Sequence, residues 1–585
     1  MGFLTPAEPP IDPVQWAGLS PRGRIKPLAA DWALNGFGTP YAVYLLYILK
    51  CVGFVFAAAW LISASTEGLG GLGDIGDWWS EPIVFEKAVV WVMLWEFCGL
   101  GAGSMPLTFR FVPPVAAIAH WLWVGTIRQP PWPNRVPLTA GSTRAAIDVG
   151  LALGVLGAGS WLLGSDPAAD GGFEAAPLIV LLGCLGALGL RDKVPFLAAR
   201  SEHYGTLLVV FLFPIENLVV ASQLVWVALW WGAASSKLNR HFPFVVTVMT
   251  ANTPWNRSRA FKRRLWRDHP DDLRPSRFGA MLAHAGTAVE LGVPTVLLVS
   301  SGGTIGAVAA LVMIAFHTHI FSTFPLAVPL EWNLMMIFGI GFLFAENGDQ
   351  PLSSLDSVGL LGFLSIVLVA IPLLGNLRPD KISFLASMRY YAGNWATSQW
   401  CFKLASGAEA KLDRGVRKAA KAVVEQVAPI YGREVAEQLL GKGLAFRAMH
   451  SHGRALVGLW PRAMEQPADY AIREGELISG ICNGYNFGDG HFHNEGLLAA
   501  VQERCNFEPG ELRVIMLEAE ALGSGRQHYR IHDAATGLVE QGWVSVADMV
   551  RRQPWLDQES GGRIAVEVIG GPGLAASELA AAARP

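Results

Sequence analysis

Several ionisable side chains of this sequence lie inside long apolar segments, where a charge is costly and usually serves a function. A carboxylate or imidazole in such a place can bind a polar ligand, carry a proton or hydrogen-bond to a neighbouring helix. Glu290 is followed four residues later by Pro294, which frees a backbone carbonyl and is typical of a bend beside a cavity. We expect one ligand-binding set, gathered from three consecutive apolar segments, to line a cavity in the membrane. Its members are His284, Glu290, His317, Glu331 and Asn333.

His317 and His319 share one apolar segment but cannot serve the same ligand. Residues two apart on a regular helix point in directions about 200° apart. We therefore expect one of the two to face the bundle and the other to face a neighbouring helix or the membrane interface.

The C-terminal third contains a second constellation, formed by two histidine-rich motifs. Alternate residues of a strand point to the same side, so an HxH pair can bind one metal ion, and two pairs with a carboxylate complete a site. The neighbouring Gly484, Gly488 and Gly490 indicate a loop, where binding residues often lie. The alternative is a tight polar turn packed on the membrane domain. The predicted metal ligands are His450, His452, Asp489, His491 and His493.

The composition predicts a membrane protein around these side chains. The chain has 585 residues, of which 52% are hydrophobic and 16% are charged, whereas soluble proteins carry about 25% charged residues. A wholly soluble globular protein is excluded. The formal net charge of −3 lacks the basic excess of nucleic-acid-binding proteins, so no nucleic-acid partner is expected.

Nine apolar segments are candidates to cross a hydrocarbon core about 30 Å thick, which takes about 20 residues of helix. They are 41–63, 83–104, 144–164, 177–190, 204–231, 278–301, 304–321, 329–345 and 358–374. The segment 111–127 contains two prolines and His120, and it is better described as a re-entrant or interfacial piece. The predicted fold is an all-α polytopic integral membrane bundle of about nine or ten spans with a C-terminal cytoplasmic α+β domain.

Loop charges orient the chain, because cytoplasmic loops are enriched in Lys and Arg. The basic loops predict that both termini are cytoplasmic, and the loops near Asp74, Asp166 and Asp349 fall on the other side. Two basic loops flank the single strong segment 204–231, so the chain must cross an even number of times between them. One solution is a short return through 242–251, which places Lys237 and His241 near the outer side. The alternative is that 204–231 forms a hairpin bent at Pro214.

Composition divides the chain into five parts. We predict a cytoplasmic N-terminal segment at 1–40, a helical transmembrane domain at 41–374, interfacial and basic amphipathic helices at 375–430, a soluble α+β domain at 431–557 and a flexible tail at 558–585. The basic helix at 408–428 either rests on an anionic leaflet or is a solvated face of the soluble domain. In that domain we expect a helix at 494–504, strands at 512–518, 527–532 and 538–546, and a hairpin at the DAATG turn, 533–537.

Long motifs along the chain resemble a bacterial family of transmembrane proteins of unknown function, which are close to this chain length. The motifs are SSKLNRHFP (235–243), AHAGTAVELGVP (283–294), MIAFHTHIFSTFPLAVPLEWN (313–333), GYNFGDGHFHNEGLL, VQERCNFEPGELRV and VADMVRRQPW. The resemblance covers nearly the whole chain. It implies membership of this actinobacterial and proteobacterial family but no activity.

Segment 204–345 also resembles, locally, the HTTM domain, the membrane fold of vitamin K-dependent gamma-carboxylase. The shared pattern is a Lys just beyond a Trp-rich span, then a span with E-x-x-x-P and another with a His. The resemblance implies that Lys237 corresponds to the region of the carboxylase base, with His241, Glu290 and His317 lining the pocket. A lysine kept neutral by a low-dielectric site can take a proton from a quinol. The chain lacks the large extracytoplasmic domain of the carboxylase, so carboxylation of a protein is not expected.

These observations predict a multi-pass protein of the bacterial inner (plasma) membrane that binds a lipid or quinone-like molecule between its helices. It would act on that molecule through Lys237 and His241 as a catalytic acid/base pair. The alternative is a non-enzymatic lipid transporter or scaffold that docks a cytoplasmic protein partner through the C-terminal domain. A third hypothesis is proton-coupled transport through Glu86, Glu96 and Glu216. The expected partners are membrane lipids, and the ligand and the reaction are not deducible from the sequence.

Overall fold

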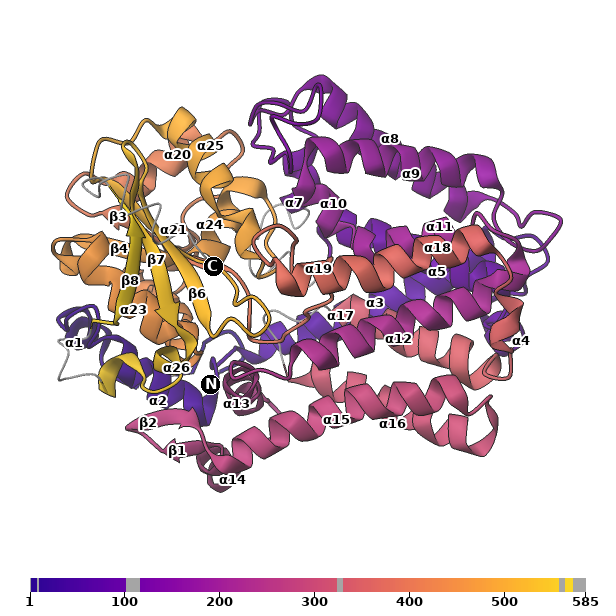
Figure 1. Ribbon diagram of the computed structural model, residues 1–585, viewed down its shortest axis with the longest axis horizontal. Coiled ribbons are helices and arrows are strands. Elements are labelled where there is room, and N and C mark those ends of the chain that lie inside the picture. Colours follow the sequence, from indigo (N-terminus) through magenta and orange to yellow (C-terminus); the bar gives the residue numbers. More distant parts are fainter. Residues whose placement is uncertain (1, 8–9, 102–115, 324–329, 557–562, 572–585) are drawn as a thin grey trace.

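The structure is a computed structural model that describes residues 2–7, 10–101, 116–323, 330–556 and 563–571. It is mostly helical and has two parts that lie side by side (Figure 1). One part is a bundle of long helices, and the other is a sheet covered by shorter helices. The predicted re-entrant piece at 111–127 is described from residue 116 onward, where it begins with the short helix α7 (Ala116–Trp121). Of the predicted flexible tail at 558–585, only 563–571 are described, and they include a strand at Val566–Gly570.

Six helices of the described residues are long and apolar enough to cross a membrane. They are α3 (Tyr41–Ala64), α8 (Ala146–Gly164), η3 with α12 (Ile215–Ser236), α15 (Arg277–Val299), α16 (Gly303–Ser322) and the run α18–η6–α19 (Val358–Leu377). The shorter helices α5 (Pro82–Phe97), α9 (Ala175–Arg191) and α17 (Leu330–Ile340), which continues into the π-helix η4 (Gly341–Glu346), run among them. The helical membrane fold is thus confirmed, and the count of nine or ten spans stays a prediction.

Helix α12 lies at the centre of the bundle, whereas α3 lies at its surface. Two-thirds of α12 is buried, compared with 17% of α3. Small residues allow this close packing: a Cβ added at Gly339 of α17 would lie 2.3 Å from the Trp226 ring of α12. The exposed apolar side chains of α3 then present a surface suited to lipid.

The two ends of the bundle differ in charge. At one end the acidic loops meet, where the backbone amide of Glu67 donates to Asp166 (2.6 Å) and that of Phe173 donates to Glu86 (2.7 Å). At the other end the basic loops contact the sheet domain, and Lys193 Nζ donates to the carbonyl of His491 (2.5 Å). The loops therefore separate as their charges predict.

The segment 204–231 is a hairpin bent at Pro214. Its first arm, η2 (Ser201–Gly205) and α11 (Thr206–Val210), leads away from the sheet, and α12 returns to it. Phe211 reaches the acidic end, where its ring lies 6.3 Å from that of Phe173. Proline cannot continue a helix because it lacks the amide hydrogen, so the chain turns there.

The predicted return crossing through 242–251 is therefore wrong. Helix α13 (Phe242–Asn252) has 11 residues, too few to cross a bilayer. It packs at the sheet end against α2 (Ile25–Asn35), and Trp32 Nε1 donates to the Val248 carbonyl (3.2 Å). Lys237 and His241 consequently lie at the end with the basic loops and the sheet domain, not at the opposite end.

The sheet has six antiparallel strands in the order β4-β3-β5-β6-β7-β8. Asp533 Oδ1 accepts from the amides of Ala535 and Thr536 and closes the β6–β7 turn. The predicted strands and hairpin are confirmed, as is the helix α25 (Glu495–Cys505). The strands are β3 (Thr397–Lys403), β4 (Tyr470–Glu474), β5 (Leu512–Leu517), β6 (Arg526–Asp533), β7 (Gly537–Ser545) and β8 (Val566–Gly570).

Strand β3 comes from the segment 375–430, where the sequence predicts interfacial and amphipathic helices. It pairs with β4 and β5 on its two sides, and six of its seven residues are buried. A buried strand carries no alternation of polar and apolar residues, so its pattern cannot be told from that of a helix. The predicted basic helix at 408–428 is also interrupted: α20 (Lys411–Gly415) ends before Lys418, which has a φ of +59°, and α21 (Val423–Tyr431) follows.

The N-terminal segment belongs to the sheet domain. Helices α1 (Pro13–Ala17) and α2 pack against α22 (Arg433–Met449), and Lys442 Nζ pairs with Asp31 (3.2 Å). The remaining elements are η1 (Leu72–Asp74), α4 (Ile75–Trp78), α7 (Ala116–Trp121), α10 (Lys193–Ala198), α14 (Arg259–Arg264), β1 (Trp266–Asp268), β2 (Asp272–Pro275), η5 (Leu352–Ser354), η7 (Ala408–Ala410), α23 (His452–Ala463), η8 (Pro467–Asp469), α24 (Gly475–Asn483), η9 (Gly490–Phe492), α26 (Val546–Met549) and η10 (Pro554–Leu556).

Candidate functional site

The residues of the predicted intramembrane set do not line one cavity. Most of them form hydrogen bonds or ion pairs in separate small groups. His317 is completely enclosed, accepting from Trp230 Nε1 at Nε2 (2.9 Å) and donating from Nδ1 to Asn333 Oδ1 (2.9 Å). The acceptor role of the amide oxygen places the ring hydrogen on Nδ1. These three side chains link α12, α16 and α17 as polar contacts between helices.

Two ion pairs account for the acidic members of the set. Lys237 Nζ pairs with Glu290 Oε2, which joins α12 to α15. Glu331 forms an ion pair with Lys50 Nζ (2.9 Å) and accepts from Trp95 Nε1 (3.2 Å), which joins α17 to α3 and α5. His284, the last member, is exposed on α15.

The histidines of the sheet domain also have separate surroundings. His450 and His452 pack against the Trp395 ring (centroids 5.7 and 5.6 Å away). His491 Nε2 lies 3.3 Å from Glu518, and His493 Nδ1 lies 2.7 Å from Ser398 Oγ. Within the described residues, no three His, Cys, Asp or Glu side chains come together as metal ligands. The metal site stays a prediction, because the described residues provide no group of ligands for it.

Burial sets the charge of most of these histidines. It lowers the pKa of His450 and that of His493 to about 3, so both are neutral at physiological pH. His491 differs. Burial by itself lowers its pKa, but the carboxylates of Glu518 and Asp489 outweigh burial and raise it above the usual value.

A different group of buried polar side chains lies where the bundle meets the sheet domain. We call it the Arg200 cluster. Arg200 directly precedes η2 and has a left-handed φ of +54° that non-glycine residues seldom adopt. The cluster joins α5, η2 and the loop after α24, and its members are Glu96, Arg200, Glu202, His203, Tyr204 and Tyr485.

The charges of the cluster lie close to one another. Arg200 Nη1 is 3.5 Å from Glu202 Oε1, which also accepts from the Tyr390 hydroxyl (3.1 Å). Glu96 and Tyr485 lie within electrostatic reach of the Arg200 guanidinium. Carboxylates thus face the guanidinium from both the bundle and η2.

Aromatic rings surround the guanidinium. Its carbon lies 3.9 Å from the centroid of the Phe487 ring and 5.8 Å from that of Trp332. Trp332 Nε1 donates to His203 Nδ1 (3.1 Å), and the imidazole of His203 stacks on the Tyr204 ring (centroids 4.6 Å apart). The cluster therefore combines polar atoms with flat apolar surfaces.

Many polar atoms of the cluster have no hydrogen-bond partner among the described residues. Both donors and acceptors are represented. They are Glu96 Oε1, Arg200 Nε and Nη1, Glu202 Oε2, His203 Nε2, and the hydroxyls of Tyr204 and Tyr485. Each unsatisfied buried polar group costs about 1–3 kcal/mol, so such a concentration is typical of a binding site.

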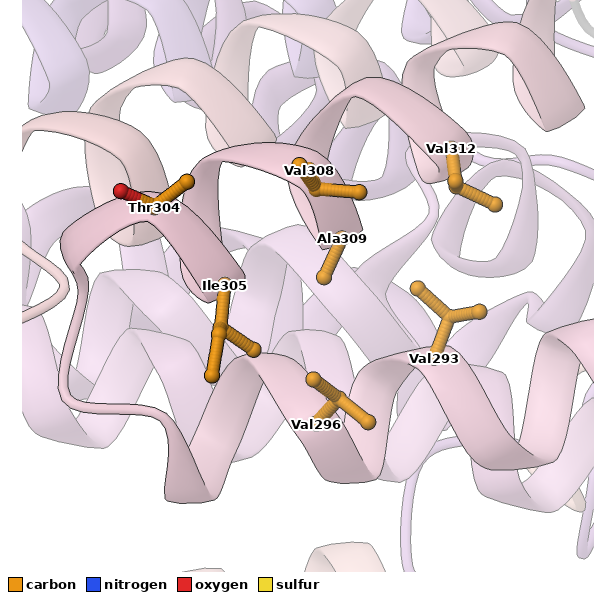
Figure 2. Close-up of a pocket in the computed structure, with 7 residues that line it drawn as sticks. All are labelled: Val293, Val296, Thr304, Ile305, Val308, Ala309 and Val312. Carbon is orange, nitrogen blue, oxygen red and sulfur yellow. The ribbon is translucent and has the colours of Figure 1, made fainter.

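A separate groove lies on the outer hairpin of the bundle, between α15 and α16. It has a volume of about 360 Å³, and Figure 2 shows its lining of Val293, Val296, Thr304, Ile305, Val308, Ala309 and Val312. The side chains point into the groove from both helices. It offers no charged group, so it fits lipid tails but holds nothing that reacts.

The sequence indicates only part of the Arg200 cluster. Glu96 stands out as an ionisable residue in an apolar segment, and Tyr485 and Phe487 lie in the GYNFGDG motif. Arg200 and Glu202 lie at the edge of the apolar segment 204–231, where an Arg is typical of a loop and does not indicate a site. The contact between that edge and the sheet domain depends on tertiary packing.

The chain belongs to a family of transmembrane proteins of unknown function (DUF3556), whose model matches residues 1–568. No curated protein and no solved structure matches the chain. The family membership expected from the sequence motifs is confirmed, whereas the bacterial origin and the local resemblance to the HTTM domain stay predictions.

Proposed function

We propose that this member of a transmembrane protein family binds a quinone-like lipid whose polar head lies in the Arg200 cluster. The observation that carries the proposal is the mixture of buried donors and acceptors in the cluster that lack partners among the described residues. A quinone head offers carbonyl oxygens to donors, and its reduced form offers hydroxyls to acceptors. The cluster supplies both kinds of group, from Arg200 and the two tyrosines on one hand and from Glu96 and Glu202 on the other.

The charge balance favours a neutral head over an anionic one. The single guanidinium of the cluster is paired with Glu202, and Glu96 is a second carboxylate within its reach. A phosphate head would meet these carboxylates and gain little from an arginine that is already paired. A neutral head with carbonyl or hydroxyl oxygens avoids this repulsion.

The surroundings favour a flat ring. Phe487 and Trp332 present their faces near the guanidinium, and aromatic side chains pack well against planar groups. Binding sites for such ligands are mostly apolar, with a few polar groups that fix the orientation. Because α5 and η2 lie in the bundle, the isoprenoid tail extends among its helices.

The test is a binding titration of the purified protein with a short-chain benzoquinone, followed by thermal shift. Tyr485→Phe and Tyr204→Phe each delete one hydroxyl that has no partner in the part of the chain that the structure describes. Each is expected to weaken binding about 5-fold, the worth of one hydrogen bond of about 1 kcal/mol, and to leave the ligand-free stability unchanged or higher.

Tyr529→Phe is the matched control, because Tyr529 lies in the sheet and its hydroxyl donates to Glu540 (2.7 Å). It should leave the affinity unchanged. Equal affinity in wild type, Tyr485→Phe and Tyr204→Phe would contradict the proposal, as would binding of phospholipid alone.

A further inference from the structure

Three side chains from distant parts of the chain form a hydrogen-bonded line at the junction of the bundle and the sheet domain. Ser451 Oγ lies 2.7 Å from His241 Nδ1, and His241 Nε2 lies 3.0 Å from Glu520 Oε2. His241 stands between α12 and α13, Ser451 between α22 and α23, and Glu520 in the loop between β5 and β6. The order of hydroxyl, imidazole and carboxylate is that of an activated nucleophile.

The carboxylate determines the tautomer of the imidazole. An ionised Glu520 can only accept, so His241 carries its hydrogen on Nε2 and leaves Nδ1 with a lone pair. Nδ1 then accepts from the Ser451 hydroxyl and can take its proton. His241 is completely buried, which keeps water from competing for this bond.

Further contacts hold the carboxylate in place. Glu520 Oε1 accepts from the amide of Gly525 (2.9 Å), so both carboxylate oxygens have a donor. Asn394 bonds the backbone of Glu520 twice, accepting from its amide (2.7 Å) and donating to its carbonyl (2.8 Å). Asn394 is therefore a positioning residue for the line.

Ser451 lies at the apex of a sharp turn. A Cβ at Gly453 would be 2.3 Å from Ala448 Cα, so only glycine allows α22 and α23 to approach this closely. Ser451 caps the 12-residue helix α23, but its hydroxyl is bonded to His241 instead of to the helix. The amide of Gly453 donates to the His450 carbonyl (3.1 Å) and closes the turn.

A second imidazole beside the line points to a ligand. The ring of His452 is parallel to that of His241 (8°, centroids 5.6 Å apart) and is completely buried. Neither of its ring nitrogens has a hydrogen-bond partner among the described residues. Burial lowers its pKa well below the usual value, so it is a neutral donor and acceptor.

We propose that Ser451, His241 and Glu520 form a catalytic triad that cleaves an uncharged ester or thioester of an apolar acyl chain. The Ser451 hydroxyl gives its proton to His241 Nδ1, and Oγ bonds to the acyl carbon. The bond from that carbon to the leaving oxygen or sulfur breaks, and the leaving group takes the proton from His241. Water then gives a proton to His241, and its oxygen bonds to the acyl carbon. The bond from that carbon to Ser451 Oγ breaks, Oγ takes the proton from His241, and the acyl chain departs as the free acid.

The surroundings define the substrate class. The exposed Leu238 and Leu522 flank His241 and Glu520 in the sequence, and the amide of Leu522 donates to the Asn376 carbonyl at the end of α19 (2.8 Å). An acyl chain thus enters between this turn and this loop, beside the bundle. The neighbouring cation Lys237 is already paired with Glu290, which disfavours a charged substrate.

A similar contact in the same domain lacks the third member. Ser398 Oγ lies 2.7 Å from His493 Nδ1, but His493 Nε2 has no hydrogen-bond partner among the described residues. No carboxylate orients this imidazole through the second nitrogen. Ser398→Ala is therefore a matched control that removes a buried serine–histidine contact.

The experiment treats the full chain in detergent with a fluorophosphonate probe and locates the adduct by peptide mass. The hydrolysis of p-nitrophenyl octanoate is measured in parallel. We expect one adduct on Ser451, no adduct and no hydrolysis in Ser451→Ala, and wild-type behaviour in Ser398→Ala. Glu520→Gln keeps the hydroxyl and should slow both reactions by roughly 10²–10⁴-fold, the usual contribution of an oriented base.

An unlabelled Ser451 in the folded wild type, or equal rates in Glu520→Gln and wild type, would overturn the proposal. Thermal unfolding of each variant shows whether a loss of rate reflects a loss of fold. The quinone titration does not depend on Ser451, so the failure of one proposal leaves the other unaffected.

Discussion

At the scale of single residues, the buried ion pair of Lys237 and Glu290 stabilises the fold. Removing one partner of a buried pair leaves an uncompensated charge and costs about 3–5 kcal/mol, whereas replacing both by apolar residues is often nearly neutral. Lys237→Met should therefore lower the unfolding temperature markedly, and Lys237→Met with Glu290→Leu should recover most of the loss. Thermal unfolding in detergent measures both. Equal unfolding temperatures for Lys237→Met and wild type would show that the pair contributes nothing.

The contact of His491 with Glu518 predicts a pH dependence. The carboxylates raise the pKa of His491 above its unfolded value, despite burial. A raised histidine pKa contributes stability that is fully present below about pH 6.5 and is lost as the pH rises through the folded pKa. The charged groups around it are Asp489, Glu518 and Lys193.

Unfolding temperatures between pH 6 and pH 9 test this dependence. The wild type should lose stability across that range, and His491→Gln should lose less because glutamine does not titrate. Parallel curves for the two proteins would show that His491 does not bind the extra proton in the folded state.

At the scale of elements, the bend at Pro214 fixes the side on which Lys237 and His241 lie. Cysteines introduced at Leu238 and Ser524, both exposed, should react with an impermeant maleimide from the same side of the membrane. A cysteine at Asp349 should react from the other side. The background is a chain whose accessible native cysteines are replaced by serine. Reaction of the Leu238 and Asp349 positions from one side would contradict the hairpin.

The sequence predicts elements best where one pattern dominates. The strand at 526–533 alternates between buried and half-buried residues, and the DAATG turn that follows it is closed by Asp533. Strand β3 was missed because both its faces are buried, and the predicted helix at 408–428 was interrupted by packing against the domain. Loop charges predict which loops lie at the same end of the bundle. They do not show how the chain returns to that end after the single segment 204–231, because the return depends on the bend at Pro214.

The candidate sites show the same limit more strongly. Glu290, His317 and Glu331 were recognised as buried polar residues, but their partners Lys237, Trp230 and Lys50 come from other helices. Contacts between residues that lie far apart in the chain produce no regular spacing in the sequence from which they could be predicted. For the same reason the contacts of Arg200 with Phe487 and of His241 with Ser451 were not predicted.

At the scale of the whole molecule, the N-terminal helices bind the sheet domain as an integral part of it. A Cβ at Gly441 would lie 2.5 Å from the Trp16 ring and 2.9 Å from Leu28. Gly441→Val should therefore displace α1 and α2 and destabilise the domain by about 1–3 kcal/mol, the usual cost of overpacking. The measurement is limited proteolysis between residues 17 and 40, with Gly443→Val as control, because a Cβ at Gly443 has nothing within 4 Å. Equal protection in both variants would contradict this docking.

The two proposed sites lie at one junction of the molecule. Arg200 contacts Phe487 of the sheet domain, and His241, which follows α12, contacts Ser451 and Glu520 of that domain, so both sites lie where the bundle meets the sheet domain. The hydrogen bonds from Lys193 to the His491 carbonyl and from Gln129 to the Phe492 carbonyl (2.7 Å) hold the bundle and the sheet domain together. Movement of the sheet domain would therefore alter both sites together.

The most direct test of the central claim is native mass spectrometry of the detergent-purified protein, combined with identification of whatever molecule leaves it on denaturation. The account predicts one quinone-like lipid per chain, reduced in occupancy by Tyr485→Phe and unchanged by Tyr529→Phe. A protein that carries no quinone-like lipid, or that carries it equally in wild type and Tyr485→Phe, would contradict the assignment of the Arg200 cluster as the binding site.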